Sequence, residues 1–307
     1  MKKTVCVTGA TGFIGKTVCN LLSCRGYRLV KVSRNKLSGY LSIGDIDEQS
    51  DWSNVLDGVD CVIHLASKAH VFDKGLSETK ETFFQVNVVG TVNLARQAAN
   101  SGVRRFIFIS SIGVNGSSST VPFLYSDKPS PYDAYTQSKY KAEKKLLEIA
   151  KKTGLEVVII RPPLVYGKNA PGNFGSLIKL VNLNIPLPFG AIYNRRSFIG
   201  VDNLADFISV CMEHPLAVDK VFLVSDDHDV STTELIDCLI KSSGNNQCLI
   251  AVNIFLLRFV ASLIGKASSI DKMVCDLQVD IDYTKKTLKW NPALSFQEGV
   301  QRCFLDD

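Results

Sequence analysis

The chain has few of the residues that build metal sites or disulfide frameworks. Its 307 residues include four histidines, His64, His70, His214 and His228, whose spacing is not that of metal ligands. The nine cysteines are an odd number and include no Cys-x-x-Cys pair, which argues against a zinc site and against a set of paired disulfides. We therefore expect no bound metal, and we expect free thiols in a cytoplasmic protein.

Long hydrophobic runs are also missing. The most apolar segment, 254–264, is interrupted by Arg258 and is shorter than the roughly 20 residues that cross a bilayer. We interpret it as a buried amphipathic helix, and we expect no membrane contact. A strand is predicted from Thr4, so no secretory signal is expected before it.

Charge of one sign is scarce as well. The net charge of +5 is small and dispersed, which argues against a nucleic-acid partner. The apolar fraction of 46% is enough for a folded core rather than a disordered chain. The length fits one large α/β domain or two interlocked ones.

Apolar runs alternate with helical patterns in the first half of the chain, which predicts a parallel sheet. Strands are expected at 4–8, 28–33, 61–65, 106–110 and 157–161, with helices at 14–23, 82–100 and 132–152. Later elements are a helix after Asp202, a strand at 221–225, a helix after Ser231 and the apolar helix from Ile254. We expect an α/β fold with a doubly wound Rossmann domain over 1–165. A smaller α/β lobe over 166–307 would bind substrate, and some of its segments would return to the first sheet.

A glycine-rich turn follows the first predicted strand and opens into a helical pattern. Gly9 permits the tight turn, Gly12 allows the backbone to approach a pyrophosphate, and Gly15 permits close packing of helix and strand. Phosphates then meet the free N–H groups at the helix N-terminus. The pattern predicts a dinucleotide site that also includes Thr11, Phe13 and Ile14.

Tyr135 and Lys139 are four residues apart, which places both on one face of the predicted helix 132–152. A phenol with a pKa of about 10 is a poor acid or base at neutral pH. A neighbouring ammonium group, and an oxidised nicotinamide, would lower that pKa. Such a tyrosine can take a proton from a hydroxyl as hydride leaves its carbon, or return one during reduction.

Several motifs together resemble the extended short-chain dehydrogenase/reductase family, in its nucleotide-sugar epimerase/dehydratase branch. They are the glycine-rich turn, the Tyr135 and Lys139 pair, and segments 44–46, 64–66, 87–91, 109–111, 161–167 and 202–206. The resemblance covers essentially the whole chain. It implies a homodimer that pairs through helices 82–100 and 132–152, and a UDP-sugar substrate.

The resemblance also implies roles for individual residues. Ser111 and Tyr135 would bond the reacting oxygen of the substrate, and Lys139 would bond the nicotinamide ribose. Further cofactor contacts would come from Asp45, Ile46, Leu65, Ala66, Lys68, Pro162 and Val165. Asn173 and Phe174 would touch the sugar nucleotide, and Arg196 would pair with its diphosphate through the guanidinium fork.

Two positions depart from common patterns of this branch. Dehydratases carry an Asp-Glu pair after the hydroxyl residue, where this chain has Ile112 and Gly113, so a 4,6-dehydratase is not expected. The second predicted strand ends in Ser33-Arg34-Asn35, all expected to contact the cofactor, whereas members that prefer NAD place an acid there. Arg34 can meet a 2′-phosphate, which favours NADP; alternatively it stacks on the adenine and either cofactor is accepted.

The resemblance leaves the reaction open. Segments 186–190 and 194–198 look most like those of bacterial O-antigen enzymes. The interpretation favoured narrowly, through Arg34, is a 4-ketoreductase of a UDP-4-keto-6-deoxy-N-acetylhexosamine that consumes NADPH. The alternative is a 4-epimerase of UDP-glucose or UDP-N-acetylglucosamine, and a third possibility is a non-catalytic scaffold that senses NADP.

Overall fold

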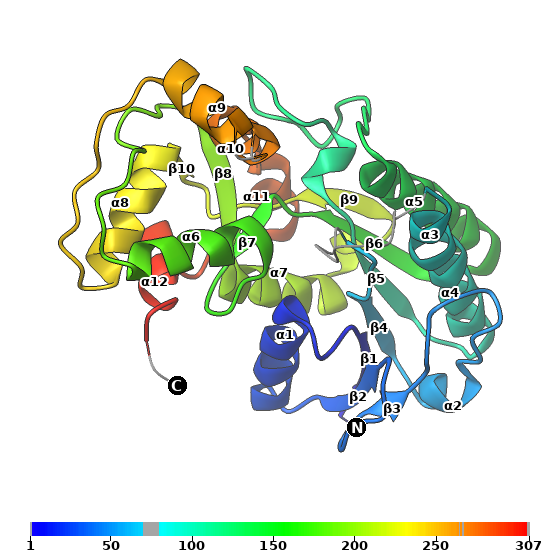
Figure 1. Ribbon diagram of the computed structural model, residues 1–307. Coiled ribbons are helices and arrows are strands. Elements are labelled where there is room, and N and C mark those ends of the chain that lie inside the picture. Colours follow the sequence, from blue (N-terminus) through cyan, green and yellow to red (C-terminus); the bar gives the residue numbers. More distant parts are fainter. Residues whose placement is uncertain (1, 70–79, 264, 266, 306–307) are drawn as a thin grey trace.

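The computed structural model describes residues 2–69, 80–263, 265 and 267–305. A parallel sheet forms its centre, and within those ranges it has seven strands in the order β3-β2-β1-β4-β5-β6-β9 (Figure 1). The strands are β1 (Thr4–Thr8), β2 (Arg28–Ser33), β3 (Leu41–Ser42), β4 (Cys61–His64), β5 (Arg105–Ile109), β6 (Glu156–Arg161) and β9 (Lys220–Leu223). The predicted doubly wound α/β fold is confirmed. The first five predicted strands are present to within one residue at either end.

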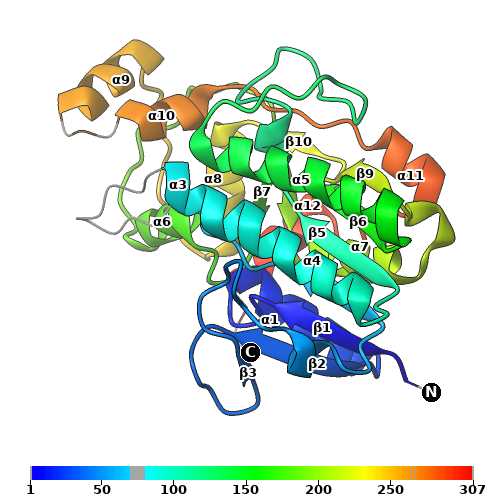
Figure 2. The same ribbon diagram turned by 90° about the vertical axis from the view of Figure 1, so that its right-hand side faces the viewer.

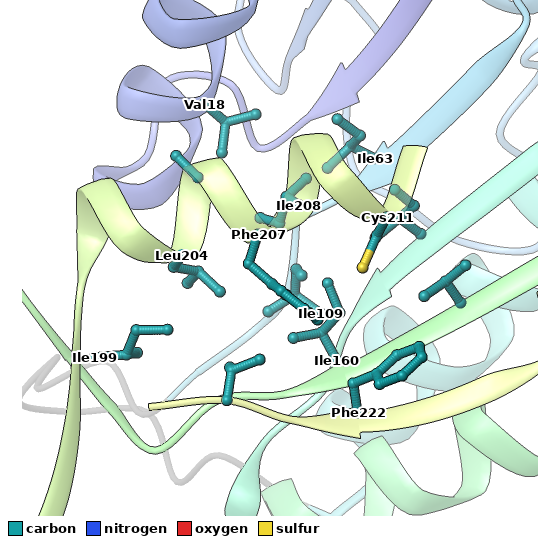
Figure 3. Close-up of a cluster of buried hydrophobic side chains, with 14 of the residues drawn as sticks. Val18, Ile63, Ile109, Ile160, Ile199, Leu204, Phe207, Ile208, Cys211 and Phe222 are labelled. Atoms are coloured by element: carbon teal, nitrogen blue, oxygen red, sulfur yellow. The ribbon is translucent and has the colours of Figure 1, made fainter. Parts of the chain in front are cut away.

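Helices cover both faces of this sheet. Helices α1 (Phe13–Cys24) and α7 (Val201–Glu213) pack on one face, while α4 (Thr91–Asn100) and α5 (Ala134–Thr153) pack on the other, which faces the viewer in Figure 2. Figure 3 shows how Phe207 and Ile208 of α7 point toward strand residues such as Ile109. Because neither face meets water, the strands are continuous apolar runs rather than alternating ones.

A smaller lobe lies beside the carboxyl ends of these strands. Its three-stranded sheet has the order β10-β8-β7 among the described residues. The strands are β7 (Leu164–Tyr166), β8 (Arg196–Gly200) and β10 (Asp229–Val230). Its helices are α6 (Gly172–Asn182), α8 (Thr232–Ser242), α9 (Ile254–Leu263), α10 (Ala267–Val274) and α12 (Phe296–Gln301). Strand β9 comes from the same part of the sequence but pairs with β6 and so completes the large sheet. Helix α11 (Asp282–Leu288) contacts β9.

The predicted helix 82–100 is wrong in detail. The structure has a short helix α3 (Lys80–Phe84), a π-helical turn Gln85–Gly90, and then α4. A π-turn inserts an extra residue, and such turns are frequent at functional sites. Here it directs the buried Asn87 side chain toward the backbone of Lys68, with bonds of 2.8 and 2.9 Å. A short helix α2 (Ser53–Leu56) precedes β4, and His70 lies outside the described residues.

The predicted helix 132–152 begins two residues later than expected. Asp133 caps it, because its carboxylate accepts from the Thr136 backbone N–H at 2.7 Å while the Thr136 hydroxyl bonds back to Asp133. Gly154 ends it in the left-handed conformation, at φ +76°. This cap fixes the first turn of α5, which carries Tyr135.

The prediction that 254–264 is a buried helix is wrong. The helix α9 exists, but Phe255 is 78% and Leu263 71% exposed, and Leu257 is the one buried side chain among those of the helix that the structure describes. Apolar residues occur around most of its circumference, so periodicity alone could not tell which face meets the protein. Over the described residues, no helix is long and apolar enough to cross a membrane.

Asp226 connects the large sheet with its helices to the smaller lobe. It lies after β9 and accepts hydrogen bonds from the Tyr166 hydroxyl at 2.6 Å, the Gly200 backbone N–H at 3.0 Å and the Asn203 amide at 2.8 Å. These partners belong to β7, β8 and α7, and both Tyr166 and Asp226 are buried. Since an unpaired buried polar group is costly, this cluster should stabilise the junction strongly.

We expect Tyr166→Phe to lower the free energy of unfolding by about 1–3 kcal/mol, because it removes one donor from a buried carboxylate. Urea unfolding measures the loss. Tyr140→Phe, a half-buried tyrosine on α5, is the control and should change stability by less than about 0.5 kcal/mol. Equal stabilities for the two variants would contradict this role of Asp226.

Candidate active site

Gly9, in the turn between β1 and α1, and Gly15, in the first turn of α1, have no room for a side chain. Gly9 has φ +67°, and a Cβ on it would lie 2.8 Å from the Ala66 backbone nitrogen. A Cβ on Gly15 would lie 2.1 Å from the Gly9 carbonyl oxygen. Among the described residues no side chain caps the N-terminus of α1, and its first turn contains no acid. Apart from the Gly12 N–H, which bonds the Gly9 carbonyl at 2.9 Å, the turn therefore offers its N–H groups and the positive end of a helix dipole to an anion.

A cavity of about 380 Å³ lies beside this turn, at the carboxyl ends of β1, β2 and β4. The predicted cofactor residues that line it are Gly9, Thr11, Gly12, Ser33, Arg34, Asn35, Asp45, Ile46, Leu65 and Ala66. The edge of the sheet where strand carboxyl ends meet is the usual ligand site of doubly wound folds. The glycine cradle and the cavity together fit a dinucleotide.

Arg34 and Asp45 face each other at the rim of this cavity. The Arg34 Nε lies 3.1 Å from a carboxylate oxygen of Asp45, and both side chains are largely exposed. The sequence expected both residues to contact the cofactor, but it did not predict that they would pair. An exposed ion pair of this kind is weak, so it does not decide between a ribose hydroxyl and a 2′-phosphate as the partner of Arg34.

The other predicted cofactor residues lie around the cavity rather than on its lining. Phe13 packs against the hydrophobic core of the smaller lobe, whereas Ile14 and Val165 pack against the main core. Gly15 is buried within α1. The Pro162 carbonyl accepts from the Ile112 backbone N–H at 2.9 Å, which connects β6 to the turn after Ser111. The backbone of Lys68 is held by Asn87.

Ser111, Tyr135 and Lys139 are placed by β5 and α5. Ser111 follows the end of β5, and its hydroxyl accepts from the Gly113 backbone N–H at 3.1 Å. The Lys139 Nζ donates to the Ile109 carbonyl at 2.8 Å, so the last residue of β5 contacts the helix that carries Tyr135. The lysine is 2% exposed.

Burial sets the protonation of this group. It raises the pKa of Tyr135 to about 12, a shift that a hydrogen bond with Ser67 partly opposes. Burial also lowers the pKa of Lys139 to about 7, against the opposing effect of the Glu143 carboxylate. The sequence expected Lys139 to lower the pKa of the phenol. In the structure desolvation is the larger effect, and the Lys139 ammonium bonds a carbonyl instead of the phenolate.

A buried ion pair lies one helical turn beyond Lys139. The Glu143 carboxylate accepts from Arg161 on β6 at 2.9 and 2.5 Å and from the Ser110 hydroxyl at 2.5 Å. Arg161 also donates to the Asn115 side chain at 2.9 Å. The cluster joins α5, β6 and the end of β5 directly beneath the lysine.

Sequence reasoning missed the role of Ser67. This residue follows β4, bonds Tyr135, and lies 3.1 Å from the Asn87 side-chain oxygen. Asn87 in turn bonds the Ser138 hydroxyl on α5 at 3.0 Å, so it braces the helix that carries Tyr135. A lone serine in a loop carries no motif, so no signal in the sequence indicated it.

A second cavity of about 200 Å³ lies between β8, α6 and α10. It brings together the predicted substrate residues Asn173, Phe174 and Arg196, and adds Lys272 from α10. The Arg196 guanidinium bonds the Lys272 carbonyl and lies 5.9 Å from the centre of the Phe198 ring. Two cations in a largely apolar pocket suit an anionic ligand with an apolar or sugar moiety. Lys272 was not predicted, because its segment has no recognisable motif.

Comparison with known proteins agrees with this architecture. The chain is 43% identical over 98% of its length to a UDP-glucose 4-epimerase of Vibrio cholerae, of which it covers 94%. It is 29% identical to an N-acetyl-alpha-D-glucosaminyl-diphospho-ditrans,octacis-undecaprenol 4-epimerase of Escherichia coli O157:H7, over 77% of this chain and 71% of that protein.

A crystal structure of UDP-N-acetylglucosamine 4-epimerase from Bacillus cereus has a similar fold, with a TM-score of 0.82 over 99% of this chain and 98% of that one. At 19% sequence identity, this likeness concerns the fold alone. The sequence profile described as "NAD dependent epimerase/dehydratase family" matches residues 5–225, which is most of the chain. The protein is therefore an enzyme that belongs to the NAD-dependent epimerase/dehydratase family.

Proposed function

We propose that this enzyme is a 4-epimerase that acts on a UDP-hexose, with UDP-glucose as the first substrate to test. The observation that carries the proposal is the match at 43% identity to a UDP-glucose 4-epimerase over nearly the full length of both chains. The grouping of Ser111, Tyr135 and Lys139 at β5 and α5 supports it, as does the bond from Tyr135 to Ser67, which lines the cavity beside the glycine-rich turn. This is the alternative weighed in the sequence analysis, and it fits the comparisons better than the 4-ketoreductase.

For the cofactor we propose NAD, held in the cavity beside the glycine-rich turn. The N–H groups of that turn would hold the pyrophosphate, and Asp45 and Ile46 would lie beside the adenine. The match to a family described as NAD dependent supports NAD over the NADP that Arg34 had favoured. When bound, the nicotinamide supplies a hydride acceptor and donor.

The chemical role of the protein is to move one proton at the 4-oxygen of the sugar. We propose that Tyr135 takes that proton during oxidation and returns it during reduction, with Ser111 bonding the same oxygen. Lys139 would bond the nicotinamide ribose, and its ammonium together with the positive charge of an oxidised nicotinamide would lower the pKa of Tyr135 from the raised value that burial gives it. Ile112 and Gly113, both buried, cannot transfer a proton, which supports epimerisation over loss of water.

For the substrate we propose that Arg196 and Lys272 hold the diphosphate in the second cavity, with Asn173 and Phe174 beside the sugar nucleotide. We also propose residues 1–165 as the cofactor domain and 166–307 as the substrate lobe, with β9 returned to the main sheet. We also propose that two copies of the chain form a homodimer that pairs through α4 and α5.

The reaction is tested by proton NMR of the enzyme with UDP-glucose and a trace of NAD. We expect UDP-galactose to form with no net reduction of cofactor. Tyr135→Phe should lower the rate by a factor of about 100 or more, because the proton acceptor is lost. No conversion, followed by oxidation of NADPH with a UDP-4-keto-6-deoxy sugar, would establish the reductase instead. Unchanged turnover in Tyr135→Phe would remove the tyrosine from the mechanism.

The buried, protonated Lys139 should lower the free energy of unfolding of the protein when no cofactor is bound. Its pKa is about 7 when folded and 10.5 in the reference state, so between these values the unfolded chain binds more protons. The penalty is full below pH 7 and disappears as the pH rises to 10.5. We expect Lys139→Met to raise the free energy of unfolding at pH 7 by about 2 kcal/mol, with the gain shrinking toward pH 10.

Denaturant unfolding at several pH values measures this effect. Lys141→Met, at an exposed position on the same helix, is the matched control and should show no such trend. A gain for Lys139→Met that stays constant with pH would contradict the assignment of the penalty to the Lys139 ammonium.

Arg196 and its neighbour Arg195 offer a matched pair for the diphosphate site. Only Arg196 lines the second cavity, while Arg195 lies exposed on the other side of the strand. We expect Arg196→Ala to raise the KM for UDP-glucose by about tenfold or more through loss of charged hydrogen bonds. Arg195→Ala should change KM by less than about twofold. Similar KM values for the two variants would remove Arg196 from the diphosphate site.

A further inference from the structure

Ser67 contacts the proposed acid-base tyrosine from a segment that carries none of the other proposed catalytic residues. Its hydroxyl bonds Tyr135, and the residue also lines the cavity beside the glycine-rich turn. Ser67 follows β4, whereas Ser111 follows β5 and Tyr135 belongs to α5. The phenol is thus held by a third segment of the chain, on the side of the proposed cofactor cavity.

The Asn87 side chain determines how the Ser67 hydroxyl is directed. The Asn87 oxygen accepts from the Lys68 backbone N–H at 2.8 Å, and its amide nitrogen donates to the Lys68 carbonyl at 2.9 Å. These two backbone bonds fix which end of the amide is the oxygen. That oxygen lies 3.1 Å from the Ser67 oxygen, so the serine is the donor in this bond. With its proton directed at Asn87, Ser67 can accept from a protonated Tyr135.

The same serine can reverse its role when Tyr135 loses its proton. A hydroxyl carries one proton and two lone pairs, and it rotates to suit its partners. A phenolate can only accept, so the Ser67 hydroxyl turns from Asn87 and donates to Tyr135. The Asn87 oxygen keeps a partner, because the Lys68 backbone N–H still donates to it. The change exchanges a neutral hydrogen bond for one to a charged oxygen, which is the stronger kind.

The other titratable groups near the phenol act on it differently. Beyond burial, Asp133 and Tyr132 raise the pKa of Tyr135 further, so both oppose the phenolate. The Lys139 Nζ lies 5.9 Å from the centre of the Tyr135 ring. Lys139 therefore acts on the phenolate through its charge, whereas Ser67 acts through a hydrogen bond.

The same network reaches the backbone of the tyrosine. The Asn87 amide donates to the Ser138 hydroxyl at 3.0 Å, and that hydroxyl donates to the Tyr135 carbonyl at 2.6 Å. Ser67 and Ser138 thus form a matched pair of hydroxyls on one amide. Ser67 contacts the phenol of Tyr135, and Ser138 contacts its backbone.

We propose that Ser67 is a positioning residue for the proposed acid-base tyrosine, because its hydroxyl donates to Tyr135 as a phenolate and turns to Asn87 when the phenol is protonated. Ser67 keeps its own proton throughout, and the proton taken from the sugar oxygen stays on Tyr135. The inference rests on the proposed function, in which Tyr135 moves the proton at the 4-oxygen.

Fluorine NMR of the full chain labelled with 3-fluorotyrosine measures the titration of Tyr135 without turnover. The Tyr135 resonance is the one that is missing from Tyr135→Phe. We expect Ser67→Ala to raise the pH midpoint of this resonance by about one pH unit, because the phenolate loses a hydrogen bond. Ser67→Thr, which keeps the hydroxyl, should restore the wild-type midpoint.

The matched control is Ser138→Ala, which removes the hydroxyl at the other end of the Asn87 amide. It should lower the Tm and leave the Tyr135 midpoint within about 0.3 pH units of the wild type, because the phenol keeps its partner. Equal midpoints in the wild type and Ser67→Ala would overturn the proposal. An equal rise in Ser67→Ala and Ser138→Ala would also overturn it, since the effect would then come from bracing of α5.

Turnover provides a second readout. At saturating NAD, Ser67→Ala should lower kcat for UDP-glucose at pH 7 by about tenfold, because the phenolate fraction falls tenfold per pH unit below the midpoint. The loss should shrink as the pH rises, and KM should change by less than about twofold. A tenfold rise in KM at unchanged kcat would assign Ser67 to ligand binding instead. If the wild type turns over no UDP-sugar, the proposed function fails, while the NMR midpoints still decide whether Ser67 bonds the phenolate.

Discussion

The buried pair between Glu143 and Arg161 is the interaction on which the geometry of the active site depends. It joins the middle of α5 to the end of β6, and through Ser110 it reaches the end of β5. Two charges out of water are retained only when their geometry and remaining hydrogen bonds are well satisfied, as they are here. The pair holds α5 against the sheet. The first turns of that helix, with Tyr135 and Lys139, then lie over the carboxyl ends of the strands.

Much of the fold could be read from the sequence, because the fold depends on local patterns. The apolar run at Thr4–Thr8, the glycine-rich turn and the alternation of strands and helices each leave a signal within about ten residues. The placement of Tyr135 and Lys139 on one face of α5 was predicted for the same reason, since helical spacing brings them together. These features need no knowledge of distant contacts.

The features that could not be predicted depend on contacts between distant segments. The π-turn around Asn87 accompanies a hydrogen bond between the Asn87 side chain and the Lys68 backbone. The exposure of α9 depends on which face of the helix packs against the core. The pKa of Tyr135 was expected to fall because a cation is near in sequence. It rises because the phenol is enclosed by parts of the chain that sequence spacing does not reveal.

The amide of Asn87 has a consequence for ligand binding. A single side chain bonds both backbone groups of Lys68, which follows the cavity-lining Ser67, and the hydroxyl of Ser138 on α5. Any ligand that orders one of these segments also restrains the other, and the coupling free energy is shared equally in both directions. Under the proposed function, retention of the dinucleotide and the position of Tyr135 are thermodynamically linked, so tight retention would also keep the proposed acid-base group in register between turnovers.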